Sequence, residues 1–435
     1  MRHYFIESFK ITKLWGYRED INLAFNNDVN VLIGVNGSGK TTVLNLLNSI
    51  LSLDISGILN VNFEYAEIHL RDFKDNSVLR TVKVDAANRL LRLRLDEKET
   101  NIDTESITGH RFTEHRRQLG KGNTLPERLP ERFVRRTIVS EKFYDELTSL
   151  VPIAWLPVNR RLPLTGDEEE WYRRTEPLES VDLRLRELLE VLSRYHSGLN
   201  TLLSERYKRF ENQVLSMILY SKEHDKFDSI SFSLPTEAEK EQLRSAFEAA
   251  KLSSKEMRSR IDNHFAVAEE VVKRAQKGEN VQLDLEDIFI LPLIGRTQAM
   301  VKYAGELEED RERIFASLRL YENTVNSFLE NKSAEVDGSG QLKIRLSSSL
   351  ELDWHLLSSG EKQILILLTE ALLRVDKSVV YIADEPELSL HVTWQEKLLE
   401  SLVTLGGQKQ IIVATHSPDI VGDFRDKVID LGRES

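Results

Sequence analysis

Residues 29–42 read VNVLIGVNGSGKTT, an apolar run followed by a glycine-rich turn and a lysine. The part from Gly34 to Thr41 fits G-x-x-x-x-G-K-[ST], a pattern in which glycines let successive backbone N–H groups curl around a polyphosphate. Residues 41–51 have the apolar spacing of a helix, whose positive end favours an anion. A strand, a glycine turn and a helix in this order predict a phosphate-binding loop. The alternative is a glycine-rich turn with an incidental lysine.

The pattern predicts roles in nucleotide binding for the residues of this loop. Lys40 would reach the β- and γ-phosphates, and the hydroxyl of Thr41 would be a ligand of Mg²⁺. ATP and Mg²⁺ are therefore the expected cofactors. The residues expected to hold the nucleotide are Gly34, Asn36, Gly37, Ser38, Gly39, Lys40, Thr41 and Thr42.

A second chemical signal is VVYIADEP, residues 379–386. A hydrophobic run that ends in Asp-Glu predicts a buried strand that delivers two carboxylates to the carboxyl end of a parallel sheet, where open α/β sheets place ligands. Asp384 would hold Mg²⁺ through water, and Glu385 would orient and deprotonate the attacking water during hydrolysis. In isolation, the same residues also fit a strand that ends in an acidic turn.

Three further motifs accompany these two. LSSGEKQ (357–363) opens a predicted helix before the second strand, LSLH (388–391) follows that strand, and THSP (415–418) follows the next one. The chain therefore resembles the ABC-type ATPases, whose signature L-S-G-G-Q/E, acidic Walker B strand, D-loop and switch histidine occur in this order. The resemblance covers about residues 1–100 and 340–431. Ser359 replaces the first signature glycine, and Glu361 replaces glutamine, a variant typical of the DNA-repair and SMC-like branch.

This resemblance implies a fold and a set of roles. The fold class would be α/β, an ABC-type P-loop ATPase head with a mixed sheet and helices. Two heads would dimerise head to tail, with each ATP between the phosphate loop of one chain and Ser358, Gly360 and Glu361 of the other. His416 would contact the γ-phosphate as a polar sensor. The residues expected to be catalytic are Glu385, His416 and Lys40.

Other positions are less sharply defined by their motifs. Asn159-Arg160-Arg161 follows a predicted strand at 152–158 and resembles the RecF/OLD-like subgroup, so Arg160 is expected to contact phosphate or to couple the lobes. Within KLWGYR (13–18), Lys13 and Trp15 lie where this group contacts the nucleotide base or ribose. The alternative for Trp15 is an aromatic side chain packed under the sheet.

The composition narrows the protein class. Of the 435 residues, 40% are hydrophobic and 30% charged, and the 20 Gly and 10 Pro are too few for a disordered or collagen-like chain. The lack of cysteine excludes a disulfide scaffold, a thiol nucleophile and a Cys-ligated zinc site. A net charge of −12 argues against a uniformly basic nucleic-acid wrapper. Because no signal peptide or apolar run of membrane length is present, we expect a cytoplasmic protein.

The hydrophobic periodicity changes twice along the chain and predicts three parts. These are the N-terminal half of the ATPase head (1–165), a helical or short coiled-coil insertion (166–335) and the C-terminal half of the head (336–435). Strands are predicted at 3–11, 21–25, 29–33, 63–70, 78–84, 90–95, 152–158, 341–346, 379–384, 410–415 and 427–431. Helices are predicted at 41–51, 181–220, 235–277, 298–329, 359–374 and 394–405, and residues 100–136 are expected to be mostly irregular.

The insertion is short, and we expect no nuclease domain after the last predicted strand. This architecture resembles the ATPase subunits of two-component anti-phage systems, the PARIS ATPase first and the Septu ATPase second. It implies a homo-oligomeric switch, without a membrane partner, that holds and releases a separate effector chain of TOPRIM or HNH nuclease type. The alternatives are a RecF-like DNA-repair or chromosome-maintenance clamp that acts directly on DNA, and a scaffold that uses ATP only for assembly.

Residues 110–136 are a basic segment in an acidic chain, HRFTEHRRQLGKGNTLPERLPERFVRR. Its arginines and lysine outnumber its glutamates, so it is expected to dock DNA or an acidic phage trigger protein. The alternative is a solvated loop and helix that pair with acidic neighbours.

Overall fold

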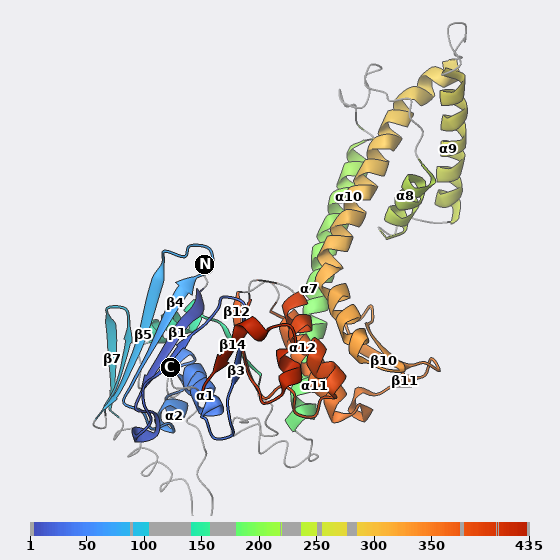
Figure 1. Ribbon diagram of the computed structural model, residues 1–435. Coiled ribbons are helices and arrows are strands. Elements are labelled where there is room, and N and C mark those ends of the chain that lie inside the picture. The colour runs from blue at the N-terminus through green and yellow to red at the C-terminus, as the bar shows by residue number, and fades with distance from the viewer. Residues whose placement is uncertain are drawn as a thin grey trace, which may run out of the picture. The chain divides into compact units, whose positions relative to one another are not determined.

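A computed structural model describes residues 4–87, 90–103, 141–156, 180–217, 219, 236–249, 255–275, 285–374, 378–405, 407 and 409–432 (Figure 1). The chain divides into two compact units. The head unit comprises Met1–Leu192 and Leu320–Ser435, and the helical unit comprises Ser193–Arg319. The boundaries of the predicted insertion, 166–335, stay a prediction. No helix within the described residues is long and apolar enough to cross a membrane.

The centre of the head unit is a parallel sheet of five strands in the order β14-β3-β13-β12-β8. Its strands are β14 (Val428–Asp430), β3 (Val29–Ile33), β13 (Lys409–Ala414), β12 (Val379–Asp384) and β8 (Ile153–Leu156). β12 and β13 are buried almost throughout, which explains the apolar run of β12 and the four apolar residues that end β13. Because Asp384 lies opposite Ala414, and Ala414 opposite Leu32, three neighbouring strands end at one edge of the sheet.

An antiparallel sheet of six strands forms a second layer, in the order β2-β1-β4-β5-β6-β7. The strands are β1 (Tyr4–Thr12), β2 (Ile21–Ala24), β4 (Tyr65–Asp72), β5 (Leu79–Ala87), β6 (Leu90–Leu95) and β7 (Lys98–Asp103). β4 alternates half-buried and buried side chains, the pattern of a strand with one face on a core. Helix α1 (Lys40–Leu51) packs on the parallel sheet, and its apolar face shares one core with the antiparallel sheet (Figure 1).

The remaining elements of the head unit flank the parallel sheet or extend from it. A three-stranded antiparallel sheet comprises β9 (Lys332–Val336), β10 (Leu342–Leu346) and β11 (Glu351–Leu352). Helix α11 (Ser359–Leu372) is buried from Gly360 to its end and contacts α12 (Val392–Thr404). The short helices are α2 (Ile55–Leu59), α5 (Glu141–Leu150) and α13 (Pro418–Val421), with 3₁₀ turns at Leu14–Gly16, Trp354–Leu356 and Arg425–Lys427.

The helical unit is built from parts of α7 (Ser180–Ser216) and α10 (Leu285–Phe328) together with α8 (Glu237–Ala249) and α9 (Lys255–Ala275). Within this unit α7 and α10 run side by side (Figure 1), and Arg206 Nε lies 3.4 Å from Asp310 Oδ2. A small core forms where the four helices meet, from Phe210, Leu243, Phe265, Val301, Ala304 and Leu307.

The observed fold is a mixed α/β head with a helical subdomain, which confirms the predicted fold class. Several elements differ from the predictions. Residues 98–103 and 332–336 form strands β7 and β9, because neighbouring strands pair with segments too polar to be recognised alone. The helix predicted at 235–277 is described as two helices, α8 and α9. Helix α10 begins at Leu285 rather than near 298, so it includes Pro292, a residue that usually ends or kinks a helix.

Candidate nucleotide-binding site

The phosphate loop lies between β3 and α1, and its glycines have conformations that few other residues adopt. Gly37 and Gly39 have φ angles of +82° and +93°. Gly39 is the N-cap of α1 and has no side chain to cap the first N–H groups of the helix. The Ser38 hydroxyl is buried and has no hydrogen-bond partner among the described residues. The site therefore offers unpaired donors where a polyphosphate fits.

The structure brings the predicted catalytic side chains together at the carboxyl edge of the parallel sheet. Lys40 Nζ donates to Gly34 O at 2.9 Å and lies 2.8 Å from His416 Nε2. The same ring nitrogen is 3.5 Å from Glu385 Oε1. Glu385 itself adopts a positive φ of 52°, and its backbone N–H donates to Ala414 O at 2.8 Å. Lysine, histidine and glutamate from three segments thus share one small volume.

The predicted metal ligands are also adjacent. Thr41 Oγ1 donates to Asp384 Oδ1 at 3.2 Å. Among the described residues no cluster of three or more His, Asp or Glu side chains could hold a metal ion by itself. Mg²⁺ usually keeps several waters and binds through one or two carboxylates and the substrate phosphates. A hydroxyl and a carboxylate beside a phosphate loop fit that requirement.

Burial shifts the pKa of two of these groups toward the neutral form. Burial lowers the pKa of Lys40, although the carboxylates of Glu385, Asp384 and Glu387 oppose the shift. Burial raises the pKa of Asp384, and the negative charge of Glu385 adds to the effect, while the hydrogen bond from Thr41 and the charge of Lys40 oppose it. The site therefore holds closely spaced carboxylates that a bound cation would stabilise.

The signature segment forms the start of α11. We call its exposed residues, Ser358 and Ser359, the α11 tip. Ser358 is the N-cap of the helix. Glu361 is buried instead: its Oε2 accepts from Ser358 N at 2.9 Å and from Ser358 Oγ at 2.8 Å, and its Oε1 accepts from Lys332 Nζ at 2.6 Å. Burial acts to raise the pKa of Glu361, but the bonds from Lys332 and Ser358 outweigh it and hold that pKa below its usual value. Glu361 thus stabilises the tip from within.

The glycine of the signature lies against the D-loop. A Cβ added at Gly360 would approach Ser389 O to 2.6 Å, so a larger residue would displace the loop. Ser389 itself has a φ of 72°. Leu356, just before the tip, is 71% exposed, and Leu388, in the D-loop, is 47% exposed. The signature segment and the D-loop therefore present an accessible surface formed by Leu356, Ser358, Ser359, Leu388 and Ser389.

Residues 13–18 contact the phosphate loop. Trp15 is partly buried, and its ring lies 2.9 Å from the position of a Cβ added at Gly39. Arg18, which the motifs did not identify, donates from Nη1 to Ser38 O and from Nη2 to Leu431 O at 2.8 Å. Its guanidinium lies 5.8 Å from the Trp15 ring centroid. Lys13 instead pairs with Glu64 at 2.9 Å.

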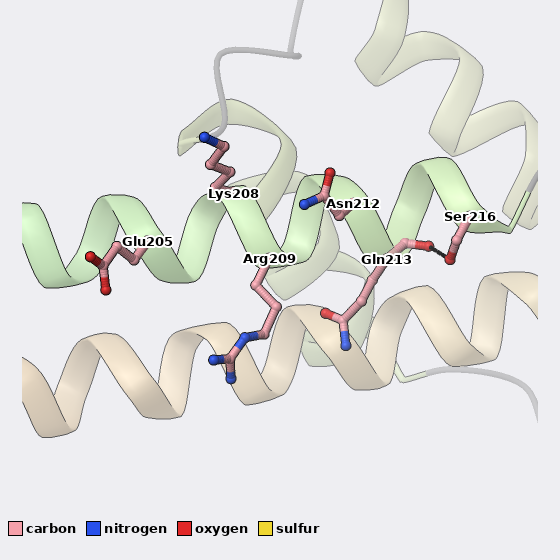
Figure 2. A pocket seen from close by; sticks show the side chains of 6 residues that line it. All are labelled: Glu205, Lys208, Arg209, Asn212, Gln213 and Ser216. Carbon is pink, nitrogen blue, oxygen red and sulfur yellow. Dashed lines mark hydrogen bonds between the residues drawn. The ribbon is translucent and has the colours of Figure 1, made fainter.

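Some predictions lie outside the site or outside the described residues. Arg160 and the basic segment 110–136 are not among the residues that the structure describes. In the helical unit, a shallow pocket on α7 contains none of the predicted site residues (Figure 2). Its lining side chains follow one side of the helix, from Glu205 to Ser216. We assign no chemistry to it.

A parallel sheet with a glycine-rich phosphate loop and a carboxylate at the end of a nearby strand defines a P-loop nucleotide-binding protein. The family model for the AAA ATPase domain matches residues 5–421. The chain belongs to this family and is an ATPase that hydrolyses ATP. No curated protein matches the sequence.

The solved structures to which the chain is similar include head domains of Smc proteins. The Smc head domain of Pyrococcus furiosus, with an extended coiled coil and bound to the C-terminal domain of ScpA, is 13% identical, with 99% of this chain and 93% of that chain covered and a TM-score of 0.41. The SMC head domain from Thermotoga maritima is 10% identical, with 96% of this chain and 90% of that chain covered and a TM-score of 0.37.

Proposed function

We propose that this ATPase is a switch in which two copies clamp ATP head to tail. Each nucleotide would lie between the phosphate loop of one copy and the α11 tip of the other. The observation that carries the proposal is the state of that tip. Ser358 and Ser359 are exposed, whereas Glu361, which bonds Ser358, is buried, and Lys332, which bonds Glu361, is partly buried. A rigid, accessible helix N-terminus is suited to bind an anion supplied by another molecule.

Within each site the residues would divide the chemistry of hydrolysis. Lys40 would exchange Gly34 O and His416 for phosphate oxygens, since an ammonium donates to any of these acceptors. Glu385 would deprotonate the attacking water, and His416 would contact the γ-phosphate. Thr41 and Asp384 would hold Mg²⁺, which would neutralise charge on the phosphates.

At the level of biological role, we propose the sensor subunit of a two-component anti-phage system of PARIS or Septu type. The support is the sequence resemblance of a compact ATPase head with a helical insertion. ATP-driven assembly would hold a separate TOPRIM or HNH effector chain, and a DNA or acidic protein trigger at residues 110–136 would release it. Co-purification with a nuclease encoded beside this gene tests the role. DNA-stimulated ATP hydrolysis without any such partner favours a RecF-like clamp instead.

Replacement of Glu385 tests the switch. In the Glu385→Gln variant we expect ATP hydrolysis to fall by about 10²-fold or more, because the general base is lost. ATP then stays bound, and the assembly persists. Light scattering should show at least a doubling of the 50.2 kDa chain mass in ATP and Mg²⁺, and not in ADP.

The control adds Ser358→Arg to Glu385→Gln, which places a bulky side chain on the exposed tip. We expect this double variant to bind ATP without a change in mass. Normal turnover by Glu385→Gln contradicts the assignment of the base. An assembly that forms equally well in the double variant contradicts the clamp.

A further inference from the structure

Glu387 joins two segments that carry different parts of the site. It lies directly before the D-loop, three residues after Asp384, and its Oε1 accepts two hydrogen bonds from the segment after β13. Thr415 Oγ1 donates to it at 2.6 Å, and the backbone N–H of His416 donates at 3.0 Å. Thr415 is completely buried, so its hydroxyl cannot exchange this partner for bulk water.

These bonds fix the backbone from which the His416 ring projects. The ring lies 2.8 Å from Lys40 Nζ and 3.5 Å from Glu385 Oε1, so a small displacement of the backbone would change both distances. Glu387 is therefore well placed to determine where the histidine lies.

The D-loop that follows Glu387 is itself held against α11. Ser389 O leaves no space for a side chain at Gly360, and Leu390 N donates to Glu387 O at 2.9 Å. A second link runs through Gln395, whose amide donates to Leu390 O at 2.9 Å and accepts from Ser417 Oγ at 2.6 Å. A continuous set of contacts thus connects the α11 tip, the D-loop and the histidine segment of one chain.

We propose that Glu387 is a positioning residue for ATP hydrolysis. It holds His416 in line with Lys40 and Glu385, and it couples the histidine to the loop that packs on α11. The inference rests on the proposed role of His416. The important property is the position of Oε1 as an acceptor, because both donors point at this one atom.

The test compares ATP turnover and ATP affinity in a set of variants. Glu387→Ala removes the acceptor. Glu387→Asp keeps the charge but, being one methylene shorter, moves the carboxylate away from Thr415 and His416, and Glu387→Gln keeps an oxygen at the same distance. We expect the first two to lower kcat at least tenfold with ATP affinity changed less than threefold, and Glu387→Gln to keep at least half of the wild-type kcat. Glu400→Ala, on the exposed face of α12, is the matched control and should retain full kcat.

A double-variant cycle separates positioning from a general loss of structure. If Glu387 acts through the histidine, Glu387→Ala combined with His416→Ala is no slower than His416→Ala alone. Losses that multiply overturn the inference, as does a Glu387→Asp variant as active as Glu400→Ala. Should Glu387→Ala fail to fold, Glu387→Asp takes its place in the cycle. Full activity of His416→Ala is a different outcome, since it removes the proposed role of the histidine itself.

Discussion

Lys40 and Arg18 are two cations that contact the phosphate loop, and they have different partners. Lys40 Nζ is held by one carbonyl and by His416, contacts that a phosphate can replace. Because an ammonium only donates, His416 Nε2 can accept from Lys40 only in the tautomer that carries no proton on that nitrogen. Arg18 is bound to two backbone carbonyls, from the phosphate loop and from the residue after β14. These contacts support the proposed role of Lys40 in ligand binding and favour support of the loop as the role of Arg18.

Loss of Arg18 should weaken nucleotide binding because the phosphate loop loses its support, although Arg18 itself is not expected to contact the nucleotide. In Arg18→Ala the carbonyls of Ser38 and Leu431 lose charged donors, a class of bond that contributes about 1.5–3 kcal/mol. We expect ATP affinity to fall about tenfold or more, and Arg18→Lys to restore little, because one ammonium cannot reproduce the forked geometry. Titration with a fluorescent ATP analogue measures this. Affinity equal to that of the exposed control Arg92→Ala contradicts the role.

At the scale of elements, the α11 tip depends on a residue of another element, 29 positions before Glu361 in the sequence. Lys332, on β9, reaches Glu361 in the first turn of α11, and Glu361 closes a capping box with Ser358. A helix start with these bonds is stable before any ligand arrives. The tip is thus preorganised, which reduces the entropic cost of binding an anion.

The capping box gives a prediction for stability and its pH dependence. Glu361→Gln should lower the free energy of unfolding at neutral pH by about 1–2 kcal/mol, as expected for a weakened cap. The pKa of Glu361 is lowered in the folded protein, so its contribution exists above the usual glutamate pKa and is lost as the pH falls through the lowered value.

Urea titrations at several pH values check this prediction, with Glu396→Gln on α12 as the exposed control. The difference between wild type and Glu361→Gln should shrink in acid. A difference that is constant from neutral to acidic pH is inconsistent with the ionised carboxylate as the source.

The elements show which parts of the fold are predictable from sequence. β12 is an almost continuous apolar run, and β3 and β13 each end in at least three consecutive apolar residues, because both faces of these strands are buried. This pattern is visible without the structure. β9 reads KSAEV and has no such run, because it forms a strand through its backbone pairing with β10 rather than through its own apolar residues. The site follows the same rule. The roles of the phosphate loop and of Asp384 follow from local motifs, whereas Arg18 and Glu387 act through partners hundreds of residues or one strand away.

At the scale of the whole molecule, the head unit carries the two surfaces that the proposed clamp would bring together. The phosphate loop and the carboxyl edge of the parallel sheet form the first, and the exposed α11 tip with the D-loop forms the second. If two copies are related by a twofold axis, the first surface of each copy contacts the second surface of the other, so both sites are formed by two chains. ATP would supply the charge that joins them, and its hydrolysis would remove that charge.

The most direct test mixes two inactive variants, Lys40→Ala and Ser358→Arg. A hybrid dimer has one site with an intact phosphate loop from the second variant and an intact tip from the first. Each hybrid dimer has one complete site, so the mixture should recover ATPase activity that neither variant has alone, from about a quarter of the wild-type rate with random pairing to about half if only hybrids assemble. A mixture no faster than its separate components would show that each chain uses its own tip, or none, and would contradict the clamp.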